Sequence, residues 1–133
     1  MAYHGYIPMM SEYLSFLYEK TSKPVKILEI GVDTGLSLFA LVNNLHVHRT
    51  PFKYTGVDIK IKNHLKSIHF AFIKDHEENT INLLEKNSLD FLDSDSEVYD
   101  LILLDGDHNY ETVFKECNLI LKNMHKNTIV LVD

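Results

Sequence analysis

The sequence has 133 residues, of which 45% are hydrophobic, so it suits one folded domain and argues against disorder. The formal net charge is −6 and the basic residues form no run, so we expect neither nucleic acid nor an anionic membrane as partner. Cys117 is the only cysteine, which excludes an internal disulfide and suits a reducing, cytoplasmic location. No apolar run reaches the roughly 20 residues of a membrane span, and no secretion signal opens the chain.

An amphipathic helix is predicted first, over residues 9–20, because apolar side chains recur there at helical spacing. Ser11 is the predicted cap of this helix, and residues 21–24 end it with a proline. We expect a single domain over residues 1–133, with this helix in residues 1–23 and an α/β core in residues 24–133.

A strand over residues 25–30 then leads into a glycine turn and a helix over residues 36–45. The unbroken apolar run of this strand indicates burial on both faces, as in a parallel sheet. Gly31 and Gly35 allow a ligand to approach the backbone, and the following helix start offers free N–H groups. Glu29 would repel a phosphate but can accept bonds from an ammonium or a hydroxyl group. The turn therefore predicts a ligand with a nucleoside and a cationic or hydroxylated part.

The second strand is predicted over residues 52–59, and Asp58 lies at its end. Residues 64–76 fit either a helix or a strand, and we expect a helix, because a parallel sheet needs a crossover of about a dozen residues here. A third strand over residues 80–85 places Asn87 and Ser88 at its carboxyl end, before a short helix over residues 89–92.

The clearest strand covers residues 99–104 and is followed by the segment D-G-D-H-N-Y-E. A helix with apolar residues at a 3-4-3 spacing is predicted over residues 110–124, with Asp107 or Asn109 as its cap. Asp107 is interpreted as a cap rather than a ligand-binding residue. The fifth strand is predicted over residues 128–132, directly before Asp133.

This alternation of strands and helices predicts a three-layer α/β/α fold with a parallel sheet. Ligands bind such sheets beyond the carboxyl ends of the strands, at the point where the strand order reverses. Every predicted strand ends in polar or acidic residues: Glu29, Asp58, Asn87, Ser88, Asp105, His108 and Asp133. We therefore expect these side chains to surround a single crevice.

Three of these segments resemble motifs of class I S-adenosylmethionine-dependent methyltransferases. E-I-G-V-D-T-G is similar to their first motif, G-V-D to the end of their second strand, and Y-D-L-I-L-L-D-G-D-H-N-Y-E to the fourth-strand motif of a small-molecule subgroup. The resemblance implies a Rossmann-like sheet of order 3-2-1-4-5 and S-adenosylmethionine as cofactor. Family members continue with two further strands, so the sequence resembles a form truncated after the fifth strand, whose edge a second copy or a partner chain would cover.

The resemblance also implies roles for the residues that match these motifs. The implied cofactor-binding residues are Glu29, Gly31, Asp33, Gly35, Asp58, Asn87, Ser88 and Asp105. Glu29 would orient the methionine ammonium, Asp58 would accept the ribose hydroxyls, and Asn87 would meet the adenine edge with Ser88. Asp33 departs from the family, which has a glycine there; either it reshapes the loop or it tolerates the left-handed conformation.

Asp105 and His108 are the predicted catalytic residues, with His108 as a general base for an oxygen acceptor. In metal-dependent catechol-type members of the family, acids at the ends of the fourth and fifth strands bind a divalent ion. Asp105 and Asp133 match these two positions, so Mg²⁺ is a candidate second cofactor, although the third family ligand would lie after Asp133.

Three functions follow as hypotheses from these motifs. The first is methyl transfer from S-adenosylmethionine to a small hydroxylated molecule, and the second is a catalytically inactive remnant that binds the cofactor or a protein partner. The third is an NAD-dependent dehydrogenase, which ranks last because the G-x-G-x-x-G spacing is absent and Glu29 precedes the first glycine.

Overall fold

The computed structural model describes residues 4–67, 73–74, 76–106 and 109–133. Helices and strands alternate along the chain, as predicted. In chain order they are η1 (His4–Tyr6), α1 (Ile7–Thr21), β1 (Val25–Ile30), α2 (Leu36–Val47), β2 (Phe52–Asp58), α3 (Asn63–Lys66), β3 (Thr80–Glu85), α4 (Ser88–Ser94), β4 (Tyr99–Leu104), α5 (Tyr110–Leu119), η3 (Ile120–Asn123) and β5 (Met124–Val132).

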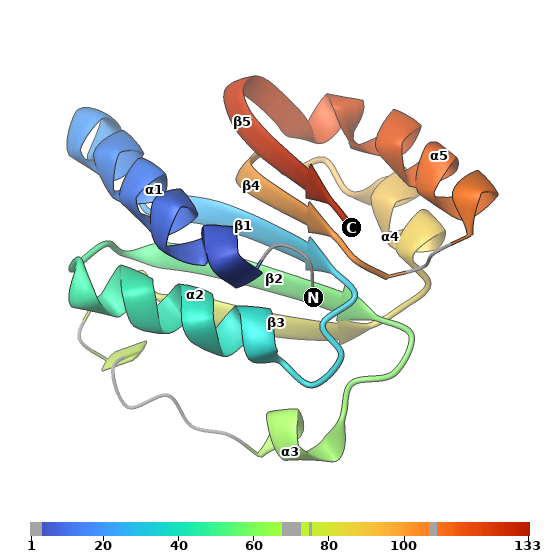
Figure 1. The fold of residues 1–133 in the computed structure, drawn as a ribbon, viewed down its shortest axis with the longest axis horizontal. Coiled ribbons are helices and arrows are strands. Elements are labelled where there is room, and N and C mark those ends of the chain that lie inside the picture. The colour runs from blue at the N-terminus through green and yellow to red at the C-terminus, as the bar shows by residue number, and fades with distance from the viewer. Residues whose placement is uncertain (1–3, 68–72, 75, 107–108) are drawn as a thin grey trace.

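The described strands form one five-stranded sheet in the order β3-β2-β1-β4-β5, and every neighbouring pair is parallel (Figure 1). This order confirms the prediction. β1 lies at the centre, and five of its six residues are buried. The unbroken apolar run of this strand therefore reflects burial on both faces, as expected for a central parallel strand.

Helices cover both faces of the sheet (Figure 1). Successive side chains of a strand point to opposite faces. Ile27 accordingly belongs to the apolar cluster beneath α1 and α2, whereas Leu28 and Ile30 belong to the cluster beneath α4 and η3. The strand order reverses between β1 and β4, so the carboxyl ends of β1, β2 and β4 surround the point where a ligand is expected.

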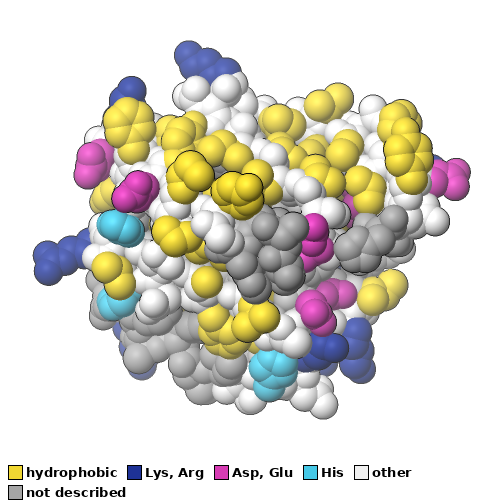
Figure 2. Space-filling view, in the orientation of Figure 1, with side chains coloured by type: hydrophobic (Ala, Val, Ile, Leu, Met, Phe, Trp, Pro, Cys, Tyr) yellow, Lys and Arg dark blue, Asp and Glu magenta, His cyan; other side chains and the backbone are white. Residues whose placement is uncertain are grey.

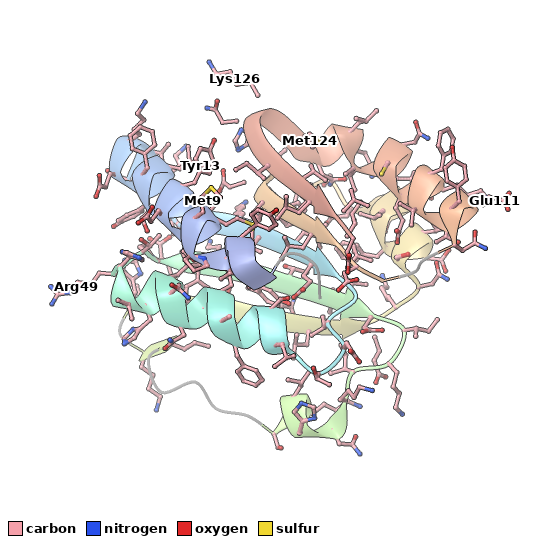
Figure 3. All side chains as sticks on the ribbon, viewed as in Figure 1. Met9, Tyr13, Arg49, Glu111, Met124 and Lys126 are labelled. Carbon is pink, nitrogen blue, oxygen red and sulfur yellow. The ribbon has the colours of Figure 1, made fainter. Side chains whose placement is uncertain are left out.

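Some apolar side chains remain at the surface over α1 and near β5 (Figure 2). Met9 on α1 is 61% exposed and Leu121 on η3 is 65% exposed. Tyr13 of α1 points toward β5 (Figure 3), and its hydroxyl donates a hydrogen bond of 2.7 Å to the carbonyl of Asn127. Within the described ranges, no helix combines the length and the apolar character needed to cross a membrane.

Two helix predictions were wrong, one in the residue that caps the helix and one in the length of the helix. Ser11 does not cap α1, which begins at Ile7; the Ser11 side chain is buried inside the helix and donates to the carbonyl of Ile7. The helix predicted over residues 64–76 is much shorter, because α3 ends at Lys66 and Ser67 has left helical geometry (φ −105°, ψ 0°). Residues 68–72 and 75 of that prediction lie outside the described part of the chain.

The helix predicted over residues 110–124 also ends early, at Leu119, and β5 begins at Met124 instead of Thr128. The intervening η3 is held by contacts with the end of α4. Lys122 Nζ donates to the carbonyls of Leu92 and Asp95, and the Asn123 amide donates to the carbonyl of Glu97 at 2.7 Å. These bonds to residues far away in sequence redirect the chain before the apolar pattern ends.

Candidate functional site

A pocket of about 200 Å³ lies at the carboxyl ends of the central strands. It is bounded by the ends of β1 and β2, by the link between β3 and α4, by the residue after Asp105, and by one residue of α5. Its lining residues are Ile30, Gly31, Val57, Asp58, Ile59, Lys86, Asn87, Ser88, Leu89, Gly106 and Thr112. The structure therefore brings together the strand ends that the sequence analysis singled out on β1, β2 and β3.

Main-chain hydrogen bonds hold the first residue after four of the five strands, β1, β3, β4 and β5. The amide of Gly31 donates to the carbonyl of Val57 at 2.8 Å, and that of Asp105 donates to the carbonyl of Ile30 at 2.8 Å. Two further bonds of the same kind join Lys86 N to Asp58 O and Asp133 N to Leu104 O, at 2.9 and 3.0 Å. The loops after β1, β3 and β4 thus start from residues that main-chain hydrogen bonds hold in place.

Gly31 is required by the neighbouring loop as well as by any ligand. Its φ is +89°, a conformation that side chains rarely adopt. A Cβ at this position would lie 2.5 Å from the carbonyl carbon of Asp105 and 2.6 Å from the Cα of Gly106. The loops after β1 and β4 are therefore in direct backbone contact, and this contact closes one side of the pocket.

The departure from the family at Asp33 now has a physical explanation. Asp33 adopts a left-handed conformation with φ 51°, which aspartate tolerates better than most residues do. Gly35 follows with φ +89° and precedes α2. Asp33 therefore supplies the same kind of backbone conformation that a glycine would supply, while its carboxylate lies 3.5 Å from Lys62 Nζ.

Asp58 lies at the end of β2, next to the glycine turn. Its Oδ2 accepts a hydrogen bond of 2.9 Å from the amide of Asp33, and the residue lines the pocket. The carboxylate thus connects the end of β2 to the glycine turn. A carboxylate accepts several hydrogen bonds at once, so Asp58 can hold the turn and accept hydroxyl groups of a ligand.

Glu29 occupies a different environment from the one predicted. Its side chain is fully buried, and its Oε1 accepts a hydrogen bond of 2.5 Å from the hydroxyl of Tyr54. Glu29 pairs in register with Gly56 on β2, and a Cβ on Gly56 would lie 2.9 Å from the Tyr54 ring. Gly56 thus makes room for the ring that reaches Glu29. The described lining of the pocket does not include Glu29, so its predicted contact with the methionine ammonium stays a prediction.

Asn87 and Ser88 line the pocket as expected, but the oxygen of Asn87 is already engaged. It accepts hydrogen bonds from the amides of Leu89 and Asp90, at 2.9 and 3.3 Å, and so caps α4. Its amide nitrogen is the group that can face a ligand at this rim.

The structure describes only some of the predicted catalytic and metal-binding residues. Asp105 is half-buried at the end of β4, beside the pocket, and Asp133 is exposed at the end of the neighbouring β5. Asp107 and His108 lie outside the described residues, and Asn109 is the cap of α5, through bonds to the amides of Glu111 and Thr112. Among the described histidines, cysteines and acids, no group of three or more is arranged to hold a metal ion.

Several residues of the site were not predicted, and four of them add to its description. Ile59 lines the pocket directly after β2, Thr112 from α5 and Leu89 from α4, and Tyr54 holds Glu29 from the neighbouring strand. Ile59 carries a usable signal in the sequence, because it is an apolar residue that directly follows the strand-end acid. Thr112 lies in the first turn of α5, and nothing in the local sequence distinguishes it.

A larger hollow of about 610 Å³ opens toward the amino ends of the strands, on the face that carries α4. Its lining includes Lys26, Asp95, Glu97 and Tyr99. These side chains are paired with one another: Lys26 Nζ lies 2.7 Å from Glu97, and the Tyr99 hydroxyl donates to Asp95 at 2.8 Å. We assign the functional site to the smaller pocket because glycines and left-handed residues leave open backbone there, and because parallel sheets bind ligands at that end.

The fold and the position of the pocket define a class of protein, the α/β proteins that bind a ligand at the switch point of a parallel sheet. Residues 28–133 match a family described as a methyltransferase domain. The chain therefore belongs to this methyltransferase family. No curated protein matches the sequence significantly.

Solved structures with the same fold include several methyltransferases. A Podospora anserina methyltransferase, PaMTH1, bound to SAH is 22% identical, with a TM-score of 0.58 over 93% of this chain and 51% of that protein. A candidate caffeoyl-CoA O-methyltransferase from Staphylococcus aureus is 18% identical, with a TM-score of 0.59 and coverage of 94% and 56%. A SAM-dependent methyltransferase from Agrobacterium tumefaciens is 15% identical, with a TM-score of 0.62 and coverage of 93% and 42%. The chain thus spans about half the length of these proteins.

Proposed function

We propose that this protein binds S-adenosylmethionine in the carboxyl-end pocket and transfers its methyl group to an oxygen atom of a small hydroxylated molecule. The observation that carries the proposal is the pocket formed by Gly31, Asp58 and Asn87 in a chain of the methyltransferase family. A pocket of about 200 Å³ suits the nucleoside part of the cofactor, with the remainder lying along the glycine turn.

The described residues fit a nucleoside. Asp58 offers a carboxylate to the two ribose hydroxyls while it holds the Asp33 amide. Ile59 and Leu89 present apolar side chains for the adenine ring, and Asn87 lines the same pocket. Bound cofactor supplies the methyl group, and the roles of these residues are to orient the nucleoside and exclude water from it.

Transfer to oxygen is supported by two observations from outside the pocket. One of the structures with this fold is described as a candidate caffeoyl-CoA O-methyltransferase. Asp105 and the predicted base His108 follow β4 in a segment rich in groups that accept a proton. An oxygen acceptor must lose its proton during transfer, which is the role proposed for His108, with Asp105 beside it.

A magnesium site at Asp105 and Asp133 has less support. The two residues follow neighbouring strands, but the described residues offer no third donor near them. We therefore derive no step through a metal ion, and magnesium enters only as a variable in the assay.

The first experiment is calorimetric titration of the protein with S-adenosylmethionine, S-adenosylhomocysteine and NAD. Binding of the first two without binding of NAD supports the proposal. Binding of NAD alone would instead support a dehydrogenase, and no binding of any of the three would remove the cofactor assignment.

The second experiment measures methyl transfer to a panel of catechols and sugars, with and without magnesium. Transfer that depends on His108, tested by His108→Ala, supports the proposed chemistry. Intact cofactor binding with no transfer to any acceptor would contradict the enzymatic function and favour a binding role for this fold.

A further inference from the structure

The segment that follows β2 is packed against the glycine turn at three points. Lys62 Nζ lies 3.5 Å from Asp33 Oδ1, and His64 Nε2 lies 2.9 Å from the carbonyl of Thr34. The side chain of Leu65 fills the space beside Gly35, where its Cδ2 would lie 2.7 Å from an added Cβ. Residues 61–66, here called the strap, therefore contact the turn at Asp33, Thr34 and Gly35.

One side chain of β3 holds the strap in turn. Oε1 of Glu85 accepts a hydrogen bond of 3.0 Å from the amide of Ile61, and the same oxygen lies 3.2 Å from Lys66 Nζ. Ile61 and Lys66 are the two ends of the strap, so a single carboxylate binds both of them. Glu85 pairs in register with Asp58, which places this contact at the same corner of the sheet as the pocket.

The charges of the side chains around Glu85 favour its contact with the strap. The bond from Ile61 and the nearby Lys66 hold the pKa of Glu85 below its usual value, so the carboxylate is ionised at neutral pH. Asp33, Asp58 and Glu85 lie close together here, and the strap brings lysines to them. Figure 2 shows acidic and basic side chains side by side near the link between β2 and α3.

We propose that Glu85 is a positioning residue for the cofactor turn, acting through the strap. This inference rests on the proposed function, because the turn matters only if the cofactor binds against it. Glu85 does not line the described pocket, so its effect reaches a ligand through Ile61, Lys62 and the carboxylate of Asp33. The Asp33 amide in turn bonds to Asp58, so a displaced strap would also disturb the residue assigned to the ribose.

The alternative is an ordinary surface ion pair, since Lys66 and Glu85 are 49% and 42% exposed. Exposed pairs contribute little to global stability, and their loss leaves distant residues unchanged. A positioning role makes a different prediction: the melting temperature stays nearly constant while the turn itself loosens. Amide hydrogen exchange at Asp33 and Gly35 separates the two, because the Asp33 amide donates to the Asp58 carboxylate and the Gly35 amide donates to the carbonyl of Val32.

The test compares Glu85→Gln with the matched control Glu97→Gln. Glu97 has a lowered pKa and a lysine partner at 2.7 Å, but it lies at the amino end of the sheet. Hydrogen exchange is measured by NMR on each protein without ligand, and S-adenosylhomocysteine affinity is measured by calorimetry. We expect Glu85→Gln to speed exchange at Asp33 and Gly35 and to weaken binding, each by roughly three- to tenfold, with Glu97→Gln unchanged.

A second variant, Lys62→Met, removes the contact with Asp33 and leaves β3 intact, and we expect a change in the same direction. If the wild-type protein binds S-adenosylhomocysteine while both variants keep wild-type exchange and affinity, the role of Glu85 is overturned and the proposed function stands. If the wild-type protein does not bind S-adenosylhomocysteine, the proposed function fails and the role of Glu85 in cofactor binding fails with it.

Discussion

The two ends of the sheet use similar side chains for different purposes. At the carboxyl end, Asp58 accepts a hydrogen bond from the amide of Asp33. At the amino end, Asp100 accepts one from the amide of Lys26, at 2.8 Å, and a second from His125 at 2.7 Å. Each end also has a glutamate paired with a lysine. Acidic side chains that bind main-chain amides therefore do not by themselves mark a functional site.

The backbone distinguishes the two ends. The carboxyl end has three residues in the left-handed region within five positions, Gly31, Asp33 and Gly35. At the amino end the corresponding polar groups face one another, as Tyr99 faces Asp95 and His125 faces Asp100. A site for a ligand thus differs from a structural polar cluster in having open backbone beside its acids, and the following substitutions test this difference.

The largest effect is expected from a side chain placed where the carboxyl end has none. Gly31→Ala introduces a Cβ 2.5 Å from the carbonyl carbon of Asp105, far inside van der Waals contact, at a φ that alanine disfavours. We expect the free energy of unfolding to fall by about 2–5 kcal/mol in urea titrations. Gly5→Ala is the control, since nothing lies within 4 Å of its added Cβ, and a change of about 0.5 kcal/mol or less is expected there. Equal effects would contradict the described contact between the two loops.

Replacing Asp58 and Asp100 by asparagine, one at a time, tests whether the two ends of the sheet differ in ligand binding. Asp58→Asn removes the charge beside the pocket, so S-adenosylhomocysteine affinity should fall by about 1.5–3 kcal/mol, or roughly 10- to 100-fold, in calorimetry. Asp100→Asn removes a comparable charge at the amino end, and its affinity should stay within about twofold of the wild-type value. A similar loss in both variants would show that the fold, and not the pocket, is being perturbed.

Glu29 offers a further test of the difference between the two ends, because it is an acid near the carboxyl end of β1 whose side chain is buried. Tyr54→Phe removes the hydroxyl that donates to it, and we expect a loss of about 1–3 kcal/mol in the free energy of unfolding. Tyr13→Phe removes a hydroxyl bond at the surface and serves as the control, with a smaller loss. If Tyr13→Phe costs as much, the buried pair has no special role.

The smallest effect concerns the amino end at alkaline pH. Burial and the bond to Asp95 raise the pKa of Tyr99 above its usual value of 10.0. Above about pH 10 the unfolded chain releases this proton while the folded chain keeps it, so stability falls as the pH rises. Tyr99→Phe lacks this loss, and the gap between its melting temperature and that of the wild type should narrow between about pH 8 and about pH 11. A constant gap for Tyr99→Phe over this pH range would argue against the assigned environment.

The strands were predictable because their signal is local. The runs at β1, β3 and β4 are bounded by turn residues, and their predicted limits agree with the observed ones. Apolar residues at helical spacing were a poorer guide after Asp58, since Ile61 and Leu65 are buried in the apolar cluster beneath α1 and α2 although α3 has only four residues. Periodicity reports which side chains are buried, and a short loop can bury them equally well.

The candidate site was predictable at the strand ends and not between them. Asp58 and Asn87 follow directly from the strand limits, because parallel strands bring their carboxyl ends to one edge. The bond from Tyr54 to Glu29 joins residues 25 positions apart, and its existence depends on the register between β1 and β2. Contacts of this kind require the three-dimensional pairing, which a single sequence does not contain.

The main-chain hydrogen bonds at the carboxyl ends of the strands bear on how the loops of such a site can change during evolution. Because Lys86 and Asp105 are held through their amides, the loops after β3 and β4 start from anchors that do not depend on the side chains of these two residues. Substrate preference can then drift by altering loop length and loop chemistry while the scaffold beneath keeps its shape. The same anchors make this rim a natural place to graft new acceptor-binding segments in protein engineering.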